Sequence, residues 1–302
     1  VKKYCDHLPL YRQSQILARQ GIEISRGTMA GWVGRGIAAL NRITDRMRED
    51  ILKSDRLFVD ETTAKVLAPG TGKTKTGHLW VMVRDDRAHA GADPPVAVYS
   101  YMPGRGAMWA TKLLAGYRGM LQVDAWQAYD QFGKADRPGG PLTIAYCWAH
   151  LRRGFIDAGK DAPVAQDALQ RIAAIYAIEK EIRGRPPTER LAVRQDRTRP
   201  LVEALHNWFT AMAPRMMAGS DTGEAMKYAL RRWDGMTAFL RDGRIEMDNN
   251  SAERAMRPVA LQRKNALFAG HELGAEHWAA IFTLVETCKM CGFRRCRPPI
   301  PI

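Results

Sequence analysis

The stretch Arg56-Leu57-Phe58-Val59-Asp60 marks the point at which the character of the sequence changes. Three consecutive apolar residues followed by a carboxylate are typical of a buried strand that ends at a polar edge of a sheet. Similar apolar runs follow at 78–83, 96–101, 120–123 and 142–146. We therefore expect a sheet of five strands.

The segments between these runs indicate how the strands are connected. The first three runs follow one another through short loops, whereas helical spacing at 106–117 separates the third run from the fourth. A short helix at 126–132 is expected before the fifth run. Strands joined first by loops and then by helices predict a mixed sheet that is covered on both faces. The predicted fold class is therefore α/β.

Helical patterns dominate the rest of the chain. From 156 to 245 the apolar spacing is helical almost throughout, with a break at Pro186-Pro187 inside a strongly basic stretch at 183–199. A block of this length is too long for a loop, so we expect an all-helical insertion. A final helical pair is expected at about 251–264 and 274–290.

The first 54 residues are predicted to form a small helical segment. Apolar spacing predicts a helix at 10–20, a turn at 21–24, and a second helix for which Ser25 is a suitable N-cap. This pattern fits a helix-turn-helix and equally a plain helical hairpin packed on the next domain. A third helix is expected at 37–54.

Composition narrows the class of partner. The chain has 302 residues, with 46 Lys and Arg against 32 Asp and Glu, which gives a formal net charge of +14. Such an excess favours a polyanionic partner, nucleic acid before membrane. No apolar run is long enough to span a membrane, so we expect a soluble, cytoplasmic protein without a membrane partner. The five cysteines are typical of reduced thiols, and the cluster Cys288, Cys291 and Cys296 is incomplete for structural zinc.

Three carboxylates stand at positions suited to metal-dependent chemistry. Asp60 and Asp124 each follow an apolar strand, and ligands bind at the strand ends of α/β sheets. Glu253 lies much further along the chain, at the start of a helix. Three such ligands suit Mg²⁺ or Mn²⁺, and two ions about 3.5 to 4 Å apart clamp the attacking and leaving oxygens of a phosphodiester. Two alternatives stay open, because strand-end aspartates are common turn formers and Asn250-x-x-Glu253 resembles a capping box.

Other motifs have structural alternatives. The segment 69–74 contains Gly-x-Gly-Lys-Thr, but we reject a phosphate loop because a strand follows where a helix should. Cys147 and His150 are possible metal ligands, and His150 is also a possible DNA contact, yet two ligands do not make a site and packing is the simpler interpretation.

A basic helix face is expected beside Glu253. Arg254 and Arg257 lie three residues apart, and Lys264 follows, so these side chains are suited to holding DNA phosphates. The alternative is a solvated face with ion pairs to Asp248 and Glu246. Pro258 would kink or end this helix.

Several longer stretches resemble one known family, and they occur in that family's order. The matching residues are Asp60-Glu61-Thr62; Gly77-His78-Leu79-Trp80; Gln122-Val123-Asp124-Ala125-Trp126 with Tyr129; Cys147-Trp148-Ala149-His150 with Arg152-Arg153; Asp248-Asn249-Asn250 with Glu253-Arg254 and Arg257-Pro258; and Arg263-Lys264-Asn265 with Leu267-Phe268-Ala269-Gly270. From about Tyr4 to Gly292 the chain resembles the transposase of the insertion-sequence-sixty-six family.

This resemblance implies a ribonuclease-H-like mixed sheet with a large all-helical insertion, preceded by a small helical segment. It implies an Asp-Asp-Glu triad that matches Asp60, Asp124 and Glu253, and Mg²⁺-dependent cleavage and strand transfer at the ends of a bacterial insertion sequence. Two ions are expected, with Mn²⁺ as a possible substitute. The expected partner is double-stranded DNA, both element ends and target, bound by a homodimer or a larger assembly. The residues expected to contact DNA are Arg152, Arg153, Arg254, Arg257 and Lys264.

The sequence departs from the family pattern in two places, and two alternative functions stay open. Ala125-Trp126 departs mildly from the family pattern, and the resemblance ends after Gly292. The alternatives are a catalytically inactive or truncated DNA-binding relic and a structure-specific nuclease on the same fold.

The chain is expected to have five parts. They are a helix-turn-helix-like segment (1–54), the first part of the catalytic core (55–155), the helical insertion (156–245), the last part of the core with the catalytic Glu (246–292) and an atypical tail (293–302).

Overall fold

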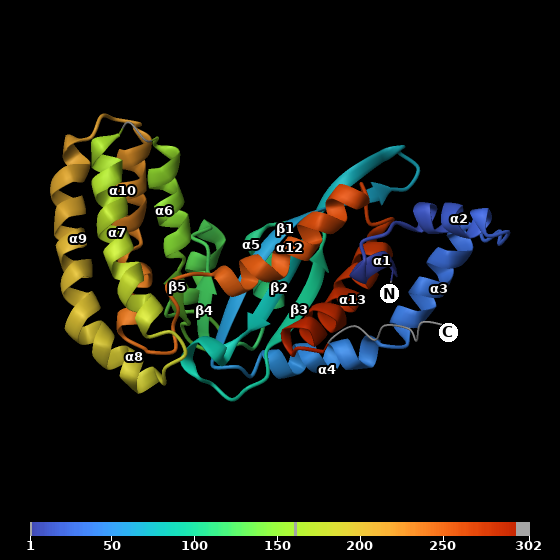
Figure 1. The fold of residues 1–302 in the computed structure, drawn as a ribbon, viewed down its shortest axis with the longest axis horizontal. Coiled ribbons are helices and arrows are strands. Elements are labelled where there is room, and N and C mark those ends of the chain that lie inside the picture. Colours follow the sequence, from blue (N-terminus) through green and yellow to red (C-terminus); the bar gives the residue numbers. More distant parts are fainter. Residues whose placement is uncertain (1, 160–161, 294–302) are drawn as a thin grey trace.

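A five-stranded mixed sheet forms the centre of the protein (Figure 1). The computed structural model describes residues 2–159 and 162–293, so most of the atypical tail lies outside the described residues. The strand order is β3-β2-β1-β4-β5, with β2 antiparallel to β1 and β3, and with β4 parallel to β1 and β5. The prediction of a mixed α/β fold is confirmed. The strands are β1 (Arg56–Ala68), β2 (Lys73–Arg84), β3 (Val96–Met102), β4 (Met120–Val123) and β5 (Thr143–Tyr146).

The helices are arranged on both sides of this sheet. The N-terminal helices lie at one end of the molecule and the helical insertion lies at the other (Figure 1). Within the described residues, no helix is both long and apolar enough to cross a membrane. The main helices are α1 (Lys2–Cys5), α2 (Leu10–Arg19), α3 (Arg26–Ala38), α4 (Asn41–Ile51), α5 (Ala107–Leu113), α6 (Trp148–Asp157), α7 (Pro163–Glu181), α8 (Pro187–Val193), α9 (Arg199–Met212), α10 (Asp221–Arg231), α11 (Trp233–Met236), α12 (Asn250–Asn265) and α13 (Glu272–Met290).

Alternating residues of β1 face two different cores. Leu57 and Val59 belong to a buried apolar cluster that continues through α5 and α6 into the insertion. Phe58 belongs to a second cluster, which α12 and α13 close from the opposite face. This alternation is the period of two that a strand imposes, and it directs Asp60 to the face that α12 covers.

The β1–β2 hairpin contains the Gly-x-Gly-Lys-Thr segment. Gly70 and Gly72 have φ angles of 78° and 66°, a left-handed conformation that favours glycine. Lys73 begins β2, so a strand follows the glycines. The segment is a hairpin turn, and the rejection of a phosphate loop is confirmed.

Two helix boundaries differ from the expectation. Of the two outcomes expected at Pro258, an end of the helix is excluded, because α12 continues to Asn265 while Ala255 and Val259 are buried against the sheet. The helix expected at 37–54 is divided, since α3 extends to Ala38 and α4 begins at Asn41. No Gly or Pro marks that division in the sequence, so the apolar pattern alone could not locate it.

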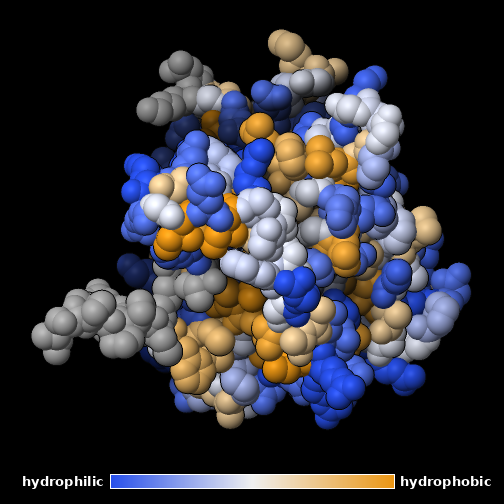
Figure 2. Space-filling model, turned by 90° about the vertical axis from the view of Figure 1, so that its right-hand side faces the viewer, coloured by the Kyte–Doolittle hydropathy of each residue, from blue (hydrophilic) through white to orange (hydrophobic). Residues whose placement is uncertain are grey.

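The N-terminal helices pack on the rest of the fold through one side. Ser25 is the N-cap of α3, as predicted, and its hydroxyl accepts the backbone N–H of Thr28 at 3.0 Å. Ile37 is buried in the cluster that α13 closes. On the other side, Trp32 is 52% exposed and Ile22 is 47% exposed. Figure 2 views this end of the molecule and shows apolar areas separated by hydrophilic ones.

Buried ion pairs join the insertion to the sheet. Arg190 of α8 contacts Glu246 at 2.6 Å, and Glu246 also lies 3.6 Å from Arg56 at the start of β1. Arg194 makes a two-point contact with Glu179 of α7, at 2.7 and 2.8 Å. The break predicted at Pro186-Pro187 coincides with the start of α8 at Pro187. The basic stretch lies partly inside the protein, because Arg190 and Arg194 are buried. The expected boundaries of the five parts stay predictions.

Candidate active site

Asp60 and Asp124 lie on neighbouring strands. In the parallel ladder of β1 and β4, Leu57 pairs with Leu121 and Phe58 pairs with Gln122. Continuing this register by two residues brings Asp60 beside Asp124, which directly follows β4. Neighbouring strands are about 4.8 Å apart, so the two carboxylates share one edge of the sheet.

Glu253 approaches these carboxylates from α12. The helix is attached to β1 by Asn249, whose side-chain Nδ2 donates a hydrogen bond to the carbonyl oxygen of Val59 at 2.8 Å. Val59 directly precedes Asp60, so this bond fixes the start of α12 next to the first carboxylate. Asn249 is 1% exposed and its backbone N–H also contacts the Cys147 sulfur at 3.2 Å.

The structure does not contain the capping box that the sequence left open. Asn249 is the N-cap of α12 and makes no side-chain capping bond. A capping box needs its acidic residue at the third helical position, which here is Ala252, and Glu253 is one residue further on. The Oε1 atom of Glu253 is shielded from solvent and has no hydrogen-bond partner within the described residues. Glu253 therefore keeps an acceptor free.

The electrostatics of Asp60 reflect a shared negative site. Burial raises the pKa of Asp60 from 3.8 to about 7, and the neighbouring charges of Glu61, Asp124 and Glu253 act in the same direction. A hydrogen bond from the backbone N–H of Glu61, at 2.8 Å, acts against this shift. Carboxylates that repel each other in a buried site bind protons or cations more readily. The structure thus brings the three sequence-predicted carboxylates into one electrostatic group.

The donor set fits hard divalent cations. In the part of the chain that the structure describes, no Lys or Arg forms an ion pair with Asp60 or Asp124. Arg105 is paired with Glu61 at 2.7 Å. Carboxylate oxygens without a paired Lys or Arg are the ligands that Mg²⁺ and Mn²⁺ prefer. Asp60, Asp124 and Glu253 are therefore the residues suited to hold such ions.

Glu61 and its neighbours form a cluster on the other face of β1, to which the sequence gave no role. Glu61 is almost fully buried and accepts hydrogen bonds from Arg105 and from the Tyr129 hydroxyl, at 2.7 and 2.8 Å. The Arg105 guanidinium lies 4.6 Å from the Trp126 ring centroid. Glu61, Trp126 and Tyr129 all fall in the motifs quoted above, but nothing in the sequence pointed to Arg105. These contacts fix the Asp124 loop against β1.

A cleft opens between Asp124 and the insertion. Its volume is about 620 Å³, and Trp126, His150 and Tyr228 contribute to its wall. Because α6 and α10 form the opposite side, the edge of the sheet that carries Asp124 and helix α10 of the insertion face the same space.

The predicted DNA contacts lie on two helices and are all exposed. Arg152 and Arg153 belong to α6, whereas Arg254, Arg257 and Lys264 belong to α12. The ion pairs expected with Asp248 and Glu246 are not formed by these residues. Glu246 contacts Arg190, and Asp248 accepts hydrogen bonds from Tyr176 and Ala149.

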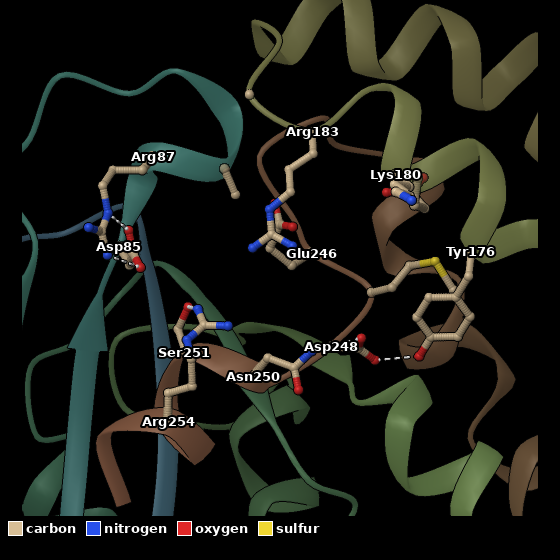
Figure 3. A pocket seen from close by; sticks show the side chains of 14 residues that line it. Asp85, Arg87, Tyr176, Lys180, Arg183, Glu246, Asp248, Asn250, Ser251 and Arg254 are labelled. Atoms are coloured by element: carbon tan, nitrogen blue, oxygen red, sulfur yellow. Dashed lines mark hydrogen bonds and ion pairs between the residues drawn. The ribbon is translucent and has the colours of Figure 1, made fainter. Parts of the chain in front are cut away.

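A second cavity, of about 350 Å³, lies beside Arg254 (Figure 3). Arg183 reaches it from the chain after α7, and Lys180 lines it from α7 itself. Burial lowers the pKa of Arg254, and the nearby Arg183 acts in the same direction while Asp85 opposes it. The lining also contains the carboxylates of Asp85, Glu179, Glu246 and Asp248, so the cavity carries charges of both signs.

Comparisons with known proteins agree with the motifs. A family model described as "Transposase IS66 family" matches residues 1–277. The chain is 42% identical over 297 residues to the uncharacterized protein y4qI of Sinorhizobium fredii, a match that covers 97% of this chain and 55% of the relative.

Two further relatives come from the same organism. The chain is 39% identical to the uncharacterized protein y4jD over 97% of this chain and 58% of the relative. It is 37% identical to the uncharacterized protein y4hP over 95% of this chain and 54% of the relative. The chain therefore spans little more than half the length of these relatives.

Proposed function

Because this chain belongs to the IS66 transposase family, we propose that it supplies the catalytic part of a metal-dependent DNA transposase. The reaction is cleavage and strand transfer at the ends of an insertion sequence, on double-stranded DNA. The mixed sheet with its helical insertion is compatible with the ribonuclease-H-like fold that the resemblance implies. Transposition joins two element ends in one complex, so the proposed assembly is a homodimer or larger.

One observation carries this proposal. Asp60, Asp124 and Glu253 come from distant parts of the sequence, and the charges of Asp124 and Glu253 both raise the pKa of the buried Asp60 carboxyl group. Within the described residues no basic side chain is paired with Asp60 or Asp124. A cluster that served only folding would be expected to contain its own cations, as the Arg190–Glu246 pair does.

Each residue group has a proposed task. Asp60, Asp124 and Glu253 hold the cations, and Asn249 keeps Glu253 beside β1 through its bond to Val59. When bound, two Mg²⁺ ions supply charge stabilisation for the attacking and leaving oxygens of the phosphodiester. The DNA backbone is held by the exposed side chains Arg152, Arg153, Arg254, Arg257 and Lys264, with Arg183 as an additional contact.

The test is Mg²⁺-dependent cleavage of element-end DNA by the Glu253→Gln variant. The protein should also carry the segments that the relatives have outside the matched region. Loss of a charged ligand at a metal site costs several kcal/mol, so we expect a cleavage rate lower by about a thousandfold. Glu224→Gln is the matched control, because Glu224 lines the same cleft but is paired with Lys227 at 2.9 Å.

The outcomes separate the candidate functions. Near-normal cleavage by the Glu253→Gln variant would remove Glu253 from the site. If the unmodified protein binds element ends but does not cut them, the chain is a DNA-binding relic. Cleavage of branched or nicked DNA without preference for element ends would indicate a structure-specific nuclease.

A further inference from the structure

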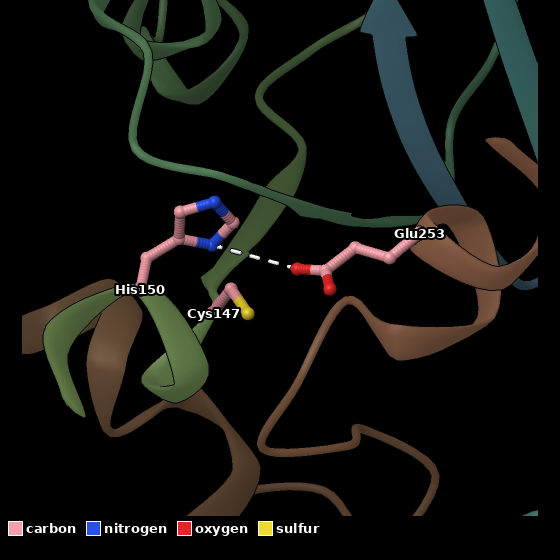
Figure 4. A group of neighbouring side chains, drawn as sticks. All are labelled: Cys147, His150 and Glu253. Atoms are coloured by element: carbon pink, nitrogen blue, oxygen red, sulfur yellow. Dashed lines mark ion pairs between the residues drawn. The ribbon is translucent and has the colours of Figure 1, made fainter. Parts of the chain in front are cut away.

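A second set of donor atoms shares Glu253 with the three carboxylates, and Figure 4 shows its members, Cys147, His150 and Glu253. Cys147 is the N-cap of α6, His150 lies in the first turn of the same helix, and Glu253 lies in the first turn of α12. Their sulfur, ring-nitrogen and carboxylate-oxygen atoms are all within 4.8 Å of one another. The His150 Nδ1 atom is 3.8 Å from Glu253 Oε1.

The spacing of these atoms is close to that of a zinc site. Zinc is bound at about 2.3 Å by sulfur and about 2.0 to 2.2 Å by nitrogen or oxygen, so tetrahedral ligand atoms lie about 3.3 to 3.8 Å apart. For a nitrogen and an oxygen ligand the separation is about 3.3 to 3.6 Å, so the observed nitrogen–oxygen distance of 3.8 Å is slightly longer than in a bound pair. Small side-chain rotations would therefore bring all three donors onto one ion.

Two of the donors have no other partner. Both His150 Nδ1 and Glu253 Oε1 are shielded from solvent without a hydrogen-bond partner in the part of the chain that the structure describes. Buried polar atoms are normally paired, and those that are not need an explanation. A bound cation would satisfy both atoms together.

Cys147 is a buried thiol whose proton a bound cation would have to displace, because burial and the nearby Asp248 raise its pKa while backbone N–H donors oppose the shift. Its side chain is 1% exposed and lies at the N-terminus of the ten-residue helix α6. The backbone N–H of Asn249 donates to the sulfur at 3.2 Å. Amide donors and helix N-termini stabilise the thiolate form, which is the form that binds metals.

We propose that Cys147, His150 and one carboxylate oxygen of Glu253 bind a zinc ion, with water as the fourth ligand, and that this ion withdraws Glu253 from the Asp60–Asp124 site. On binding, the thiol proton is released to solvent and the sulfur forms the bond to zinc. The mixture of sulfur, nitrogen and oxygen favours zinc over Mg²⁺, which prefers oxygen alone. The zinc site stands on its own, whereas the competition for Glu253 rests on the proposed function.

The site is tested with Co²⁺, which reports thiolate ligation through a sulfur-to-cobalt absorption band. The starting protein carries Cys288→Ser, Cys291→Ser and Cys296→Ser, which removes the other cysteine cluster. We expect one Co²⁺ per chain with a thiolate band and tetrahedral visible bands. The Cys147→Ser variant should lose the thiolate band, and His150→Gln should weaken Co²⁺ binding at least tenfold.

Cys5→Ser is the matched control, since Cys5 lies outside this cluster, and it should leave the spectrum unchanged. A thiolate band that survives in the Cys147→Ser variant would overturn the site, as would absence of the band in the starting protein. If the Cys147→Ser variant does not fold, the partly exposed His150 still decides, because undiminished Co²⁺ affinity in His150→Gln contradicts the proposal.

Competition for Glu253 is measured without an activity assay. Binding of Mn²⁺ is followed by its electron paramagnetic resonance signal, with and without one equivalent of Zn²⁺. We expect Zn²⁺ to weaken Mn²⁺ binding at least tenfold, and His150→Gln to remove this effect. Unchanged Mn²⁺ affinity would overturn the competition. If Mn²⁺ does not bind at all, the proposed function fails, while the Co²⁺ spectrum still reports on the zinc site.

Discussion

The segment 246–253 connects two groups of buried charges, one around Glu246 and one around Asp60. The neighbours of these two carboxylates carry opposite charges. Around Glu246, burial would raise the pKa, but Arg190 and Arg56 reverse this effect and lower it. Around Asp60, burial raises the pKa to about 7, and every neighbouring charge with a large effect is another carboxylate. In the first group, Glu246 is paired with two arginines of the described chain. The second requires cations from solution, which is the physical difference between a structural ion pair and a candidate catalytic site.

The largest effect is expected from breaking the paired group. Replacing Arg190 by Met leaves Glu246 buried with the more distant Arg56 and deprives Glu179 of one partner. Removing one member of a buried ion pair typically costs about 3 to 5 kcal/mol. Urea unfolding should show a loss of this size. Arg197→Met is the control, since its pair with Glu181 is exposed, and it should change stability little. Equal losses in both variants would contradict the contrast.

Burial of Asp60 and the repulsion among its neighbouring carboxylates should make the stability of the protein depend on pH. The pKa of Asp60 is about 7 in the folded protein, above its ordinary value of 3.8, so the folded state binds this proton more tightly. The resulting stabilisation is fully present below about pH 3.8 and is lost as the pH rises through about 7. At about 1.36 kcal/mol per unit, the loss is of the order of 4 kcal/mol.

This pH effect is measured by unfolding between pH 5 and pH 8 without divalent cations. Stability should fall over this interval, and the Asp60→Asn variant should show a smaller fall because it cannot ionise. The exposed Asp157 provides the control substitution Asp157→Asn, which should follow the unmodified chain. An identical fall in the Asp60→Asn variant would show that other groups cause it.

A smaller effect is expected at the connection between the two groups. Asn249→Ala removes the buried hydrogen bond to Val59 that places Glu253 beside β1. Loss of such a bond typically costs about 1 to 2 kcal/mol. Asn265→Ala is the control, because its bond to Leu261 is exposed. Thermal unfolding of the two variants compares them, and a neutral Asn249→Ala would mean that packing alone holds α12.

The smallest effect concerns exposed cations and should leave stability unchanged. If Lys264 contacts one DNA phosphate, the Lys264→Gln variant should reduce the slope of log affinity against log salt by about 0.9. Lys227→Gln is the comparison, since Lys227 is already paired with Glu224. Titrations at several salt concentrations measure both slopes. Equal changes in the two variants would show only the loss of net charge.

The sequence predicted the strands and helices better than the side-chain contacts between them. An apolar run that ends in a carboxylate is a local signal, so the strands and the neighbouring positions of Asp60 and Asp124 followed from it. The position at which α12 starts is not determined by the local sequence, because it depends on contacts of Asn249 with the distant residues Val59 and Cys147. The capping-box alternative failed for that reason.

The basic stretch shows the same limit for charge. Arginines in a run are usually solvated, but Arg190 and Arg194 are 1% and 0% exposed. Their partners, Glu179 and Glu246, come from other segments, so composition could not reveal the pairing. Arg105 was missed because no residue near it in sequence points to Glu61.

Calorimetric titration of Mg²⁺ tests most directly the central claim that Asp60, Asp124 and Glu253 form a cation site. The chain at pH 7.5 should bind Mg²⁺ with a saturable signal, and Asp60→Asn and Asp124→Asn should each abolish or strongly weaken it. Asp221→Asn, which alters the same cleft outside the three carboxylates, should bind normally. Undiminished Mg²⁺ binding by the Asp60→Asn and Asp124→Asn variants would contradict the account.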